Sequence, residues 1–313
     1  METQYISLAA GLLLLYVGGE LLIRGAESLA SRLGMTPLLI GLTVVAFATS
    51  SPELVVSVSA ALDGHGDVAL GNVVGSNICN VALILGVAAL IRPVRVQIQL
   101  LRIDVPILIL CSGGLMVFLA NDVISRAEAT ALLGGIIVYQ GFCVWQARRE
   151  TEAASHEIEE ALPRTPRSPA IEIALIGIGV LALAGGGKLF VDGAVALATS
   201  LGVSPAVIAL TLVALGTSLP ELAATIVATV KGHSDMAAGS VIGSCIFNLL
   251  AVLGVTALIE PVARGEIRTL DLMTMTGFSV LLLPLMFSRF SITRAEGVLM
   301  IGCYAAYLTW LVT

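Results

Sequence analysis

Two glutamates lie inside long apolar stretches of the 313-residue chain. Glu53 belongs to the segment FATSSPELVVS (47–57), and Glu221 belongs to VALGTSLPELAAT (213–225). A carboxylate deep in a membrane-spanning segment costs at least about 2.5 kcal/mol, so it normally faces the protein interior and marks a functional site. We therefore expect both glutamates to take part in function.

Oxygen-bearing groups accompany each glutamate. Thr49 lies four residues before Glu53 and shares its helix face, and Ser50 lies one step round. Pro52 lacks a backbone N–H, so the carbonyl of Ala48 loses its helical partner and the helix is expected to bend. The second segment repeats this arrangement with Gly216, Thr217, Ser218, Pro220 and Glu221. Hydroxyls, a free carbonyl and a carboxylate thus become available within one turn of each helix.

Two further segments supply hydroxyl and amide groups at matched positions. GNVVGSNICN (71–80) places Ser76 and Asn80 on one helix face, and GSVIGSCIFN (239–248) does the same with Ser244 and Asn248. Glycines recur every four residues along a neighbouring face of both segments, which permits close helix approach. We therefore expect four helices to meet around one oxygen-rich pocket.

The expected ligand set consists of oxygen atoms. Thiolate and imidazole groups are absent from the paired positions, which disfavours zinc and copper and favours hard cations such as Ca²⁺ or Na⁺. Two carboxylates balance one divalent or two monovalent cations, and an unbalanced charge would be costly in a medium of low dielectric constant. The pattern predicts a cation site.

The composition is that of an integral membrane protein. Hydrophobic residues make up 57% of the chain and charged residues only 12%, with a mean hydropathy of +1.00, whereas soluble domains carry about 25% charged residues. Apolar runs of helical length recur throughout, and the alternating pattern of a β-barrel is absent. We predict an all-α protein with ten transmembrane helices, at 6–23, 37–62, 68–91, 103–120, 125–145, 170–190, 204–230, 237–259, 270–287 and 292–312.

The chain contains an internal duplication. Shifting the sequence against itself by 168 residues aligns the halves without a gap and pairs Pro37 with Pro205, Thr49 with Thr217, Glu53 with Glu221, Asn80 with Asn248, and Arg126 with Arg294. Each half holds five predicted spans, and because five is odd the second half enters the membrane from the opposite side. Inverted repeats of this kind are typical of secondary transporters, which bind substrate near the bilayer midplane. We predict a first five-helix repeat over 1–146, a linker over 147–169 and a second, inverted repeat over 170–313.

The basic residues predict an orientation. If the N-terminus lies outside, twelve of the 16 Lys and Arg residues fall in cytoplasmic loops, including the 147–169 linker. Such an excess is typical of cytoplasmic loops. The sequence thus predicts a multi-pass protein of the cell inner (plasma) membrane with both termini outside. Its expected partners are the lipid bilayer and the transported ions, and we expect no nucleic acid, no obligate protein partner and no prosthetic group.

The motifs ATSSPE (48–53) and GTSLPE (216–221), together with GSNICN (75–80) and GSCIFN (243–248), resemble the α1 and α2 repeats of the Ca²⁺/cation antiporter superfamily. Within that superfamily the chain is most similar to prokaryotic sodium/calcium exchangers. The resemblance covers the whole chain. It implies a ten-helix fold in which the first and sixth spans move against an eight-helix core. It also implies exchange of Na⁺ for Ca²⁺ by alternating access, in the direction of Ca²⁺ export.

The resemblance also implies a role for each site residue. Glu53 and Glu221 would bind Ca²⁺ and share Na⁺, and Thr49 and Thr217 would complete the Ca²⁺ site through backbone oxygens. The flanking Na⁺ sites would use Ser50, Ser76, Ser218 and Ser244, with the carbonyls of Ala46 and Ala214. Asn80 would line the centre. Asn248 departs from relatives that have an aspartate there, which argues against potassium co-transport.

The sequence alone leaves other functions of the protein open, as well as purely structural roles for the serines and asparagines of the motifs. A Ca²⁺/H⁺ antiporter is one alternative, although the GNAxE type of motif usual in such proteins is absent. An intramembrane serine hydrolase with Ser50 or Ser218 as nucleophile is another, although no histidine falls in a predicted span. Two structural roles are the alternatives here: serine hydroxyls that bond back to the preceding helical turn, and asparagines that join helices by hydrogen bonds. His65 and His233 lie in matched turns and are interpreted as ordinary turn residues.

Overall fold

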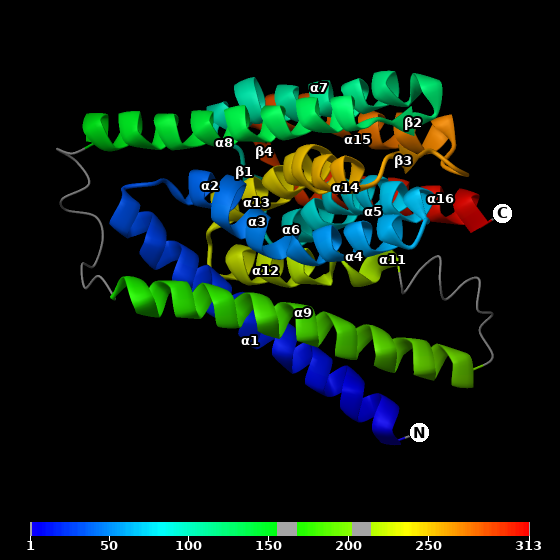
Figure 1. The fold of residues 1–313 in the computed structure, drawn as a ribbon. Helices are drawn as coiled ribbons and strands as arrows, with labels where there is room; N and C mark the ends of the chain where they lie inside the picture. The colour runs from blue at the N-terminus through cyan, green and yellow to red at the C-terminus, as the bar shows by residue number, and fades with distance from the viewer. Residues whose placement is uncertain (1, 155–167, 202–213, 313) are drawn as a thin grey trace.

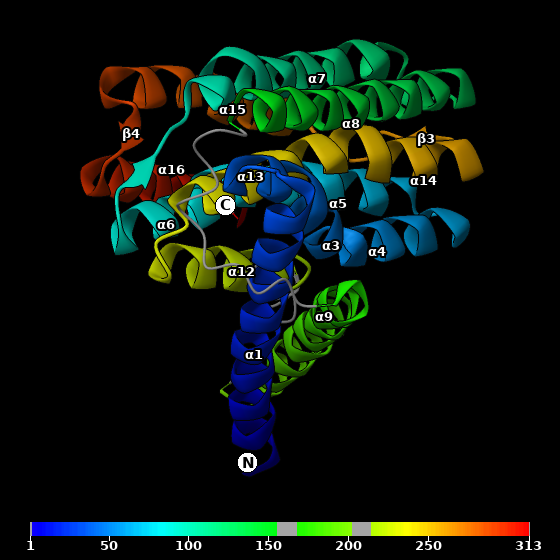
Figure 2. The same ribbon diagram turned by 90° about the vertical axis from the view of Figure 1, so that its left-hand side faces the viewer.

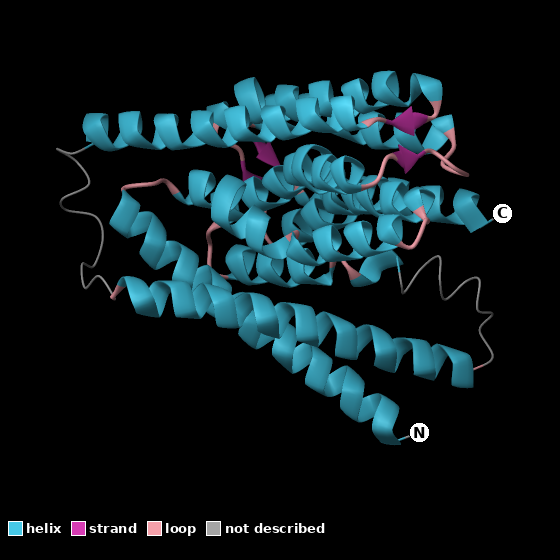
Figure 3. Ribbon diagram, viewed as in Figure 1, coloured by secondary structure: helices cyan, strands magenta, loops and turns pink. Residues whose placement is uncertain are grey.

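The computed structural model describes residues 2–154, 168–201 and 214–312. This part of the chain is almost entirely helical (Figure 3). The α-helices of the first half are α1 (Glu2–Leu33), α2 (Pro37–Ile40), α3 (Ala46–Thr49), α4 (Ser51–Leu62), α5 (Gly66–Ile78), α6 (Leu85–Ile91), α7 (Val105–Phe118) and α8 (Arg126–Ala154). Those of the second half are α9 (Pro169–Ser200), α11 (Ala214–Gly216), α12 (Leu219–Val230), α13 (Ser234–Phe247), α14 (Leu253–Ile259), α15 (Thr269–Arg289) and α16 (Arg294–Val312).

Short irregular turns and strands connect these helices. The π-helical turns are η1 (Gly41–Val45), η2 (Cys79–Ile84), η3 (Leu100–Asp104) and η7 (Asn248–Val252), and η4 (Leu119–Asn121) is a 3₁₀ turn. Strand β1 (Val94–Arg95) pairs antiparallel with β4 (Ser291–Ile292), and β2 (Val123–Ile124) pairs antiparallel with β3 (Val262–Ala263). The all-α expectation therefore missed two small strand pairs. They satisfy backbone groups in loops that lie between helices, and each joins one half of the chain to the other.

The structure confirms a helical, multi-pass membrane protein. Within the described residues, seven helices are long and apolar enough to cross a membrane, and the pair Pro37–Thr49 and Ser51–Leu62, bent by 42°, gives an eighth. The predicted span 292–312 corresponds to α16, which is not among these candidate membrane-spanning helices. The predicted span 204–230 contains the short helices α11 and α12, while residues 202–213 lie outside the described part of the chain.

The duplication seen in the sequence recurs in the helix boundaries. Helices α4 and α12 begin and end 168 residues apart, and so do α6 and α14. Strands β1 and β3 show the same offset. The two halves of the chain therefore repeat their local structure as well as their sequence.

The helices form three layers (Figure 1). Helices α7, α8 and α15 make one outer layer, and α1 and α9 cross each other on the opposite side, as the turned view in Figure 2 also shows. Between them lie α4, α5, α12, α13 and α14. Every residue of α13 except Asp235 is buried, so this helix forms the centre of the core.

Helices α1 and α9 make direct backbone contact through glycines. These recur every seven residues, at Gly11, Gly18 and Gly25 of α1 and at Gly179, Gly186 and Gly193 of α9. A Cβ on Gly18 would lie 2.7 Å from the backbone nitrogen of Leu183, and one on Gly179 would lie 2.7 Å from that of Leu22. The antiparallel pair can approach this closely only because the side chains are missing.

A buried carboxylate fastens the same two helices near one end. Glu172 of α9 is fully buried, and Arg32 of α1 donates to both of its carboxylate oxygens, at 2.7 and 3.1 Å. Ser28 adds a third hydrogen bond, at 2.7 Å. The contacts of Glu172 with Arg32 and Ser28 thus add charge-assisted hydrogen bonds to the packing of α1 on α9.

Candidate ion-binding site

The predicted helix break occurs at the first glutamate motif. Helix α3 ends at Thr49 and α4 begins at Ser51, while Ser50 between them has φ −82° and ψ 3°. Pro52 in the first turn of α4 has no N–H to continue the hydrogen-bond ladder, which explains the 42° bend. Ser218 has nearly the same backbone angles, φ −87° and ψ 2°, directly before α12. Both motifs therefore lie where a helix is interrupted.

Most of the predicted site residues lie in the protein interior. Ten of the twelve have at most 2% of their surface exposed, namely Ala46, Thr49, Ser50, Glu53, Ser76, Asn80, Ser218, Glu221, Ser244 and Asn248. Thr217 is partly exposed. Ala214 is the first residue of α11, and its side chain lies outside the described residues.

Hydrogen bonds join the motifs of the two halves. Ser50 Oγ donates to Glu221 Oε1 over 3.2 Å. Thr49 Oγ1 lies 3.3 Å from Ser244 Oγ, and Ser244 Oγ is 3.5 Å from the carbonyl oxygen of Ala46. The first motif thus contacts both α12 and α13, as expected for a site shared between the halves.

Seven oxygen atoms at this place are buried without a hydrogen-bond partner among the described residues. They are Oε1 and Oε2 of Glu53, Oε2 of Glu221, Oγ of Ser76 and Ser218, and Oδ1 of Asn80 and Asn248. Buried polar atoms are nearly always paired, so such a concentration needs an explanation. A hard cation supplies one, because it binds carboxylate, hydroxyl and amide oxygens and neutralises the two carboxylates.

The two carboxylates are accompanied by neutral hydroxyl and amide oxygens, and oxygen is the ligand that hard cations prefer. Within the described part of the chain, no group of three or more His, Cys, Asp or Glu side chains is placed to hold a metal ion. Two π-helical turns lie at the site: η2 begins at Cys79, one residue before Asn80, and η7 begins at Asn248 itself. Turns of this kind are frequent at functional sites, where they re-aim side chains.

Asn72 is a site residue that the sequence analysis missed. Its Nδ2 donates to the carbonyl of Glu53 over 3.2 Å and to Ser57 Oγ over 3.0 Å. Thr217 Oγ1 donates to Asn72 Oδ1 over 3.1 Å. One amide therefore connects the first glutamate motif to the second. Its counterpart in the second half is Ser240, so the duplication contains no matching pair of asparagines at this position.

Asn77 is a second asparagine without a match in the other half, because its counterpart is Cys245. Asn77 Nδ2 donates to the carbonyl of Cys245 over 3.2 Å, and Asn248 Nδ2 donates to Asn77 Oδ1 over 3.4 Å. The amide nitrogen of Asn248 is thus engaged, whereas both amide atoms of Asn80 are unpaired among the described residues. The two asparagines that match in sequence differ in their contacts.

Close helix packing covers one side of the site. A Cβ on Gly239 would lie 2.6 Å from the carbonyl oxygen of Leu38, and one on Gly243 would lie 2.7 Å from that of Leu42. On this side α13 packs directly on the backbone of α2 and η1. The site is therefore closely covered on this side. The counterpart of α2 and η1 in the second half, residues 205–213, lies outside the described part of the chain.

A family model described as sodium/calcium exchanger protein matches the chain twice, at residues 3–145 and 171–313. The chain belongs to the sodium/calcium exchanger family. The two matched ranges are offset by 168 residues, the same offset that aligns the halves. As a member of this family the protein is a membrane transporter and not an enzyme, so the serine hydrolase alternative is wrong.

Relatives in bacteria and archaea resemble the exchanger along its whole length. It is 36% identical to the putative antiporter CaxA of Alkalimonas amylolytica, with 96% of each chain covered. It is 37% identical to the inner membrane protein YrbG of Escherichia coli, covering 97% of this chain and 95% of that protein. It is 32% identical to the sodium/calcium exchanger MaX1 of Methanosarcina acetivorans, with 98% of each chain covered.

A solved structure shares the fold of the exchanger. The sodium-calcium exchanger NCX_Mj, in crystals soaked without Na⁺ and Ca²⁺, superimposes with a TM-score of 0.83 at 30% identity, and 99% of each chain is covered. The same protein soaked with 10 mM Na⁺ and 10 mM Sr²⁺ gives a TM-score of 0.81. The match supports a cation-transporting fold.

Proposed function

We propose that the protein is a secondary antiporter that exchanges Na⁺ for Ca²⁺ by alternating access and exports Ca²⁺ at the expense of the inward Na⁺ gradient. The observation that carries the proposal is the group of seven unpaired, buried oxygens around Glu53 and Glu221. Such a group requires positive charge to be stable in a membrane. The charge of the two carboxylates equals that of one Ca²⁺ or two Na⁺ ions.

In the proposed site, the two glutamates bind Ca²⁺ and take part in Na⁺ binding. Thr49 and Thr217 contribute backbone oxygens to the Ca²⁺ position. The flanking Na⁺ positions use the hydroxyls of Ser50, Ser76, Ser218 and Ser244 and the carbonyls of Ala46 and Ala214. Asn80 and Asn248 line the centre between them. The contacts between Ser50 and Glu221 and between Thr49 and Ser244 support this assignment, because they bring ligands from both halves together.

We further propose that the halves are five-helix repeats of opposite orientation, over 1–146 and 170–313, in the inner membrane with both termini outside. The equal offsets of helices and family matches support the repeats. In alternating access, the site opens first to one side of the membrane and then to the other. The close packing at Gly239 and Gly243 covers the site on the side of α2 and η1. The α1–α9 unit is the element that moves against the core.

The coupling ion is tested by flux in proteoliposomes. Vesicles containing the purified protein should take up ⁴⁵Ca²⁺ when an outward Na⁺ gradient is imposed. No comparable uptake should follow an outward K⁺ gradient or a proton gradient alone. Uptake driven by protons and indifferent to Na⁺ would instead show the Ca²⁺/H⁺ antiporter, in which the glutamates exchange protons for Ca²⁺. Protein-free vesicles give the background.

Asn72→Ala should weaken Ca²⁺ binding without removing a charge. The change deletes the amide that holds Thr217 and the Glu53 carbonyl. Two net hydrogen bonds of about 1 kcal/mol each correspond to a rise of roughly tenfold or more in the Ca²⁺ concentration for half-maximal uptake. The initial rate of Na⁺-driven uptake against Ca²⁺ concentration measures it.

The matched control is Ser240→Ala at the equivalent position of the second half. The hydroxyl of Ser240 is buried and has no partner among the described residues, so its removal should leave half-saturation within about twofold of the original value. Equal half-saturation in the Asn72→Ala protein and the unaltered protein would show that the amide bridge does not position the ligands.

A further inference from the structure

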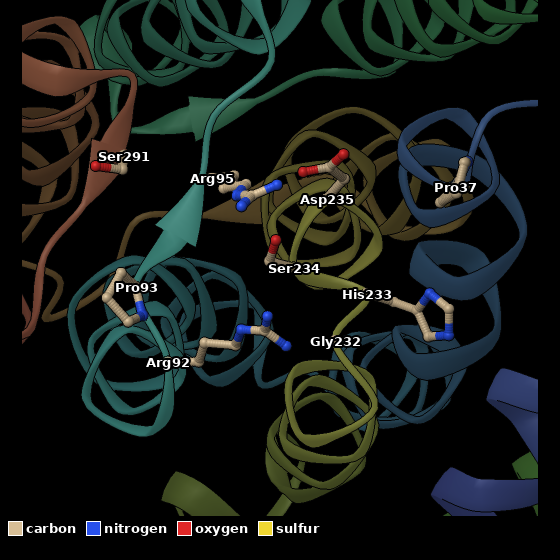
Figure 4. Close-up of a pocket in the computed structure, with 9 residues that line it drawn as sticks. All are labelled: Pro37, Arg92, Pro93, Arg95, Gly232, His233, Ser234, Asp235 and Ser291. Carbon is tan, nitrogen blue, oxygen red and sulfur yellow. The ribbon is translucent and has the colours of Figure 1, made fainter.

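A cavity of about 470 Å³ lies at the end of the molecule where α13 begins (Figure 4). It is formed by the loop after α6, the α12–α13 loop, the start of α2 and strand β4, so both halves contribute to it. Ser234 at its wall precedes Ser244 of the ion-binding site by ten residues of α13, a distance of about 15 Å along the helix. The cavity is therefore separate from the proposed ion-binding site.

Two arginines give this cavity a positive charge. Arg92 and Arg95 both line it, and neither forms an ion pair with a residue that the structure describes. Arg92 lies over Gly232, where a Cβ would be 2.9 Å from the Arg92 Nη1 atom. Asp235 is the one carboxylate in the lining, and Gln97 donates to its Oδ2 over 2.8 Å. The two guanidinium groups carry two positive charges against the one negative charge of Asp235.

Ser234 adds a hydrogen-bond donor between the arginines. The residue is 7% exposed, and its side chain makes no hydrogen bond to any described residue. In Figure 4 its hydroxyl is drawn between the guanidinium groups of Arg92 and Arg95. Ser234 is also the first residue of the 14-residue helix α13, whose N-terminus carries no side-chain cap. The uncapped N–H groups of such a helix end favour an anion.

The other basic side chains of the α12–α13 loop lie beside carboxylates of α1. Lys231 Nζ lies 2.9 Å from Glu20 Oε1, and His233 Nε2 lies 2.8 Å from Glu27 Oε1. Both partners belong to α1. His233 therefore lies beside α1 as well as in the turn. Arg24 of α1 also lies 2.6 Å from Glu20 Oε1, so Lys231 and Arg24 share one carboxylate. In the cavity lining, Arg92 and Arg95 are the basic side chains without a carboxylate partner among the described residues.

The duplication provides an internal comparison for this cavity. Shifted by 168 residues, Arg92 corresponds to Glu260 and Arg95 to Ala263. Asp235 corresponds to Asp67, and Ser234 corresponds to Gly66. The four matched positions of the other half therefore carry two acids and no arginine, although Arg264 follows Ala263 directly. Strand β3 repeats strand β1 without a basic residue at either matched position, so the fold does not require arginine at positions 92 and 95.

We propose that this cavity binds a phosphate group, with Arg92 and Arg95 as the charged ligands and Ser234 and the start of α13 as hydrogen-bond donors. The planar guanidinium fork matches phosphate oxygens in pairs, and helix N-terminal N–H groups bind the same atoms. The phosphate belongs to either a free anion or the headgroup of an anionic lipid. Binding at this place bridges the loop after α6 to the α12–α13 loop, which also holds α1 through Lys231 and His233.

The test measures binding to the purified full-length protein in detergent and is therefore independent of the proposed transport activity. One arm adds inorganic phosphate, with chloride at equal ionic strength as reference, since unspecific surface attraction is screened equally by both salts. The other arm adds dihexanoyl phosphatidylglycerol, with dihexanoyl phosphatidylcholine as reference. The unfolding temperature is recorded against the concentration of each probe. We expect a saturable rise with phosphate, with phosphatidylglycerol or with both, and the responding arm identifies the source of the phosphate group.

Two sets of variants locate the response. The R92Q/R95Q protein should need a concentration at least about tenfold higher for half of the effect, and S234A at least about threefold higher. The control R102Q/R289Q removes two arginines that lie outside the cavity lining, and it should behave like the unaltered protein. S234A keeps both charges and removes one hydroxyl. If the R92Q/R95Q protein does not elute as a folded protein, the probe concentration for half of the effect in S234A tests the proposal. Absence of a saturable response to both probes, or equal loss in the two double variants, would overturn the proposal.

Discussion

Proteoliposomes carrying Glu53→Gln should accumulate no more ⁴⁵Ca²⁺ under an outward Na⁺ gradient than protein-free vesicles. Both carboxylate oxygens of Glu53 are buried and have no partner among the described residues, so the cation is their proposed counter-charge. Removing one partner of a buried charge pair costs about 3 kcal/mol or more, which corresponds to a loss of roughly a hundredfold in affinity. The initial rate of uptake measures the effect.

The fold should survive this substitution. In buffer without Na⁺ or Ca²⁺, a neutral amide at position 53 replaces a carboxylate that has no counter-charge, so the unfolding temperature should stay equal or rise. Addition of Ca²⁺ should raise it in the unaltered protein but not in the variant. The control is Glu260→Gln, the same chemical change at a side chain that is 56% exposed, and it should transport normally. Normal flux in the Glu53→Gln protein would refute the site.

Gly179→Ala should destabilise the contact between α1 and α9 and slow transport. The added Cβ would lie 2.7 Å from the backbone nitrogen of Leu22 and 2.9 Å from the carbonyl oxygen of Gly18. Backbone atoms cannot turn away as a side chain can, so the helices must separate. Overpacking of this kind costs about 1–3 kcal/mol. We expect a lower unfolding temperature and a several-fold lower rate of exchange, because the unit that moves is distorted.

Gly177→Ala is the matched control on the same helix. Gly177 is exposed, and a Cβ there would meet no described atom within 4 Å. In a helix interior this change alone stabilises by roughly 0.5–1 kcal/mol. The unfolding temperature should therefore stay the same or rise slightly. If both alanine variants behaved alike, close backbone contact would not be what holds α1 to α9.

The helix breaks and the composition of the site were predictable because they depend on local chemistry. Pro52 interrupts its helix wherever that helix is placed, since the missing N–H is a property of the residue. The matched pairs Glu53 with Glu221 and Ser76 with Ser244 are visible in the sequence because duplication preserves order. Burial in the structure then followed from polar residues lying on one face of apolar helices.

What the sequence could not supply is the way in which the two halves meet. Asn72 and Asn77 lack a matching residue in the second half, yet they bind Thr217 and Asn248 there. The two strand pairs and the cavity beside Arg92 likewise join loops from both halves.

The sequence by itself determined that the protein is a helical membrane protein with a duplicated, oxygen-rich pair of glutamate motifs, because apolarity, proline breaks and repetition are properties of neighbouring residues. The tertiary structure alone decided where the repetition fails. Thr217 donates to Asn72, whereas Thr49, its counterpart, lies against Ser244. Equivalent segments of one chain meet different neighbours, and a one-dimensional comparison of the halves contains no information about those neighbours.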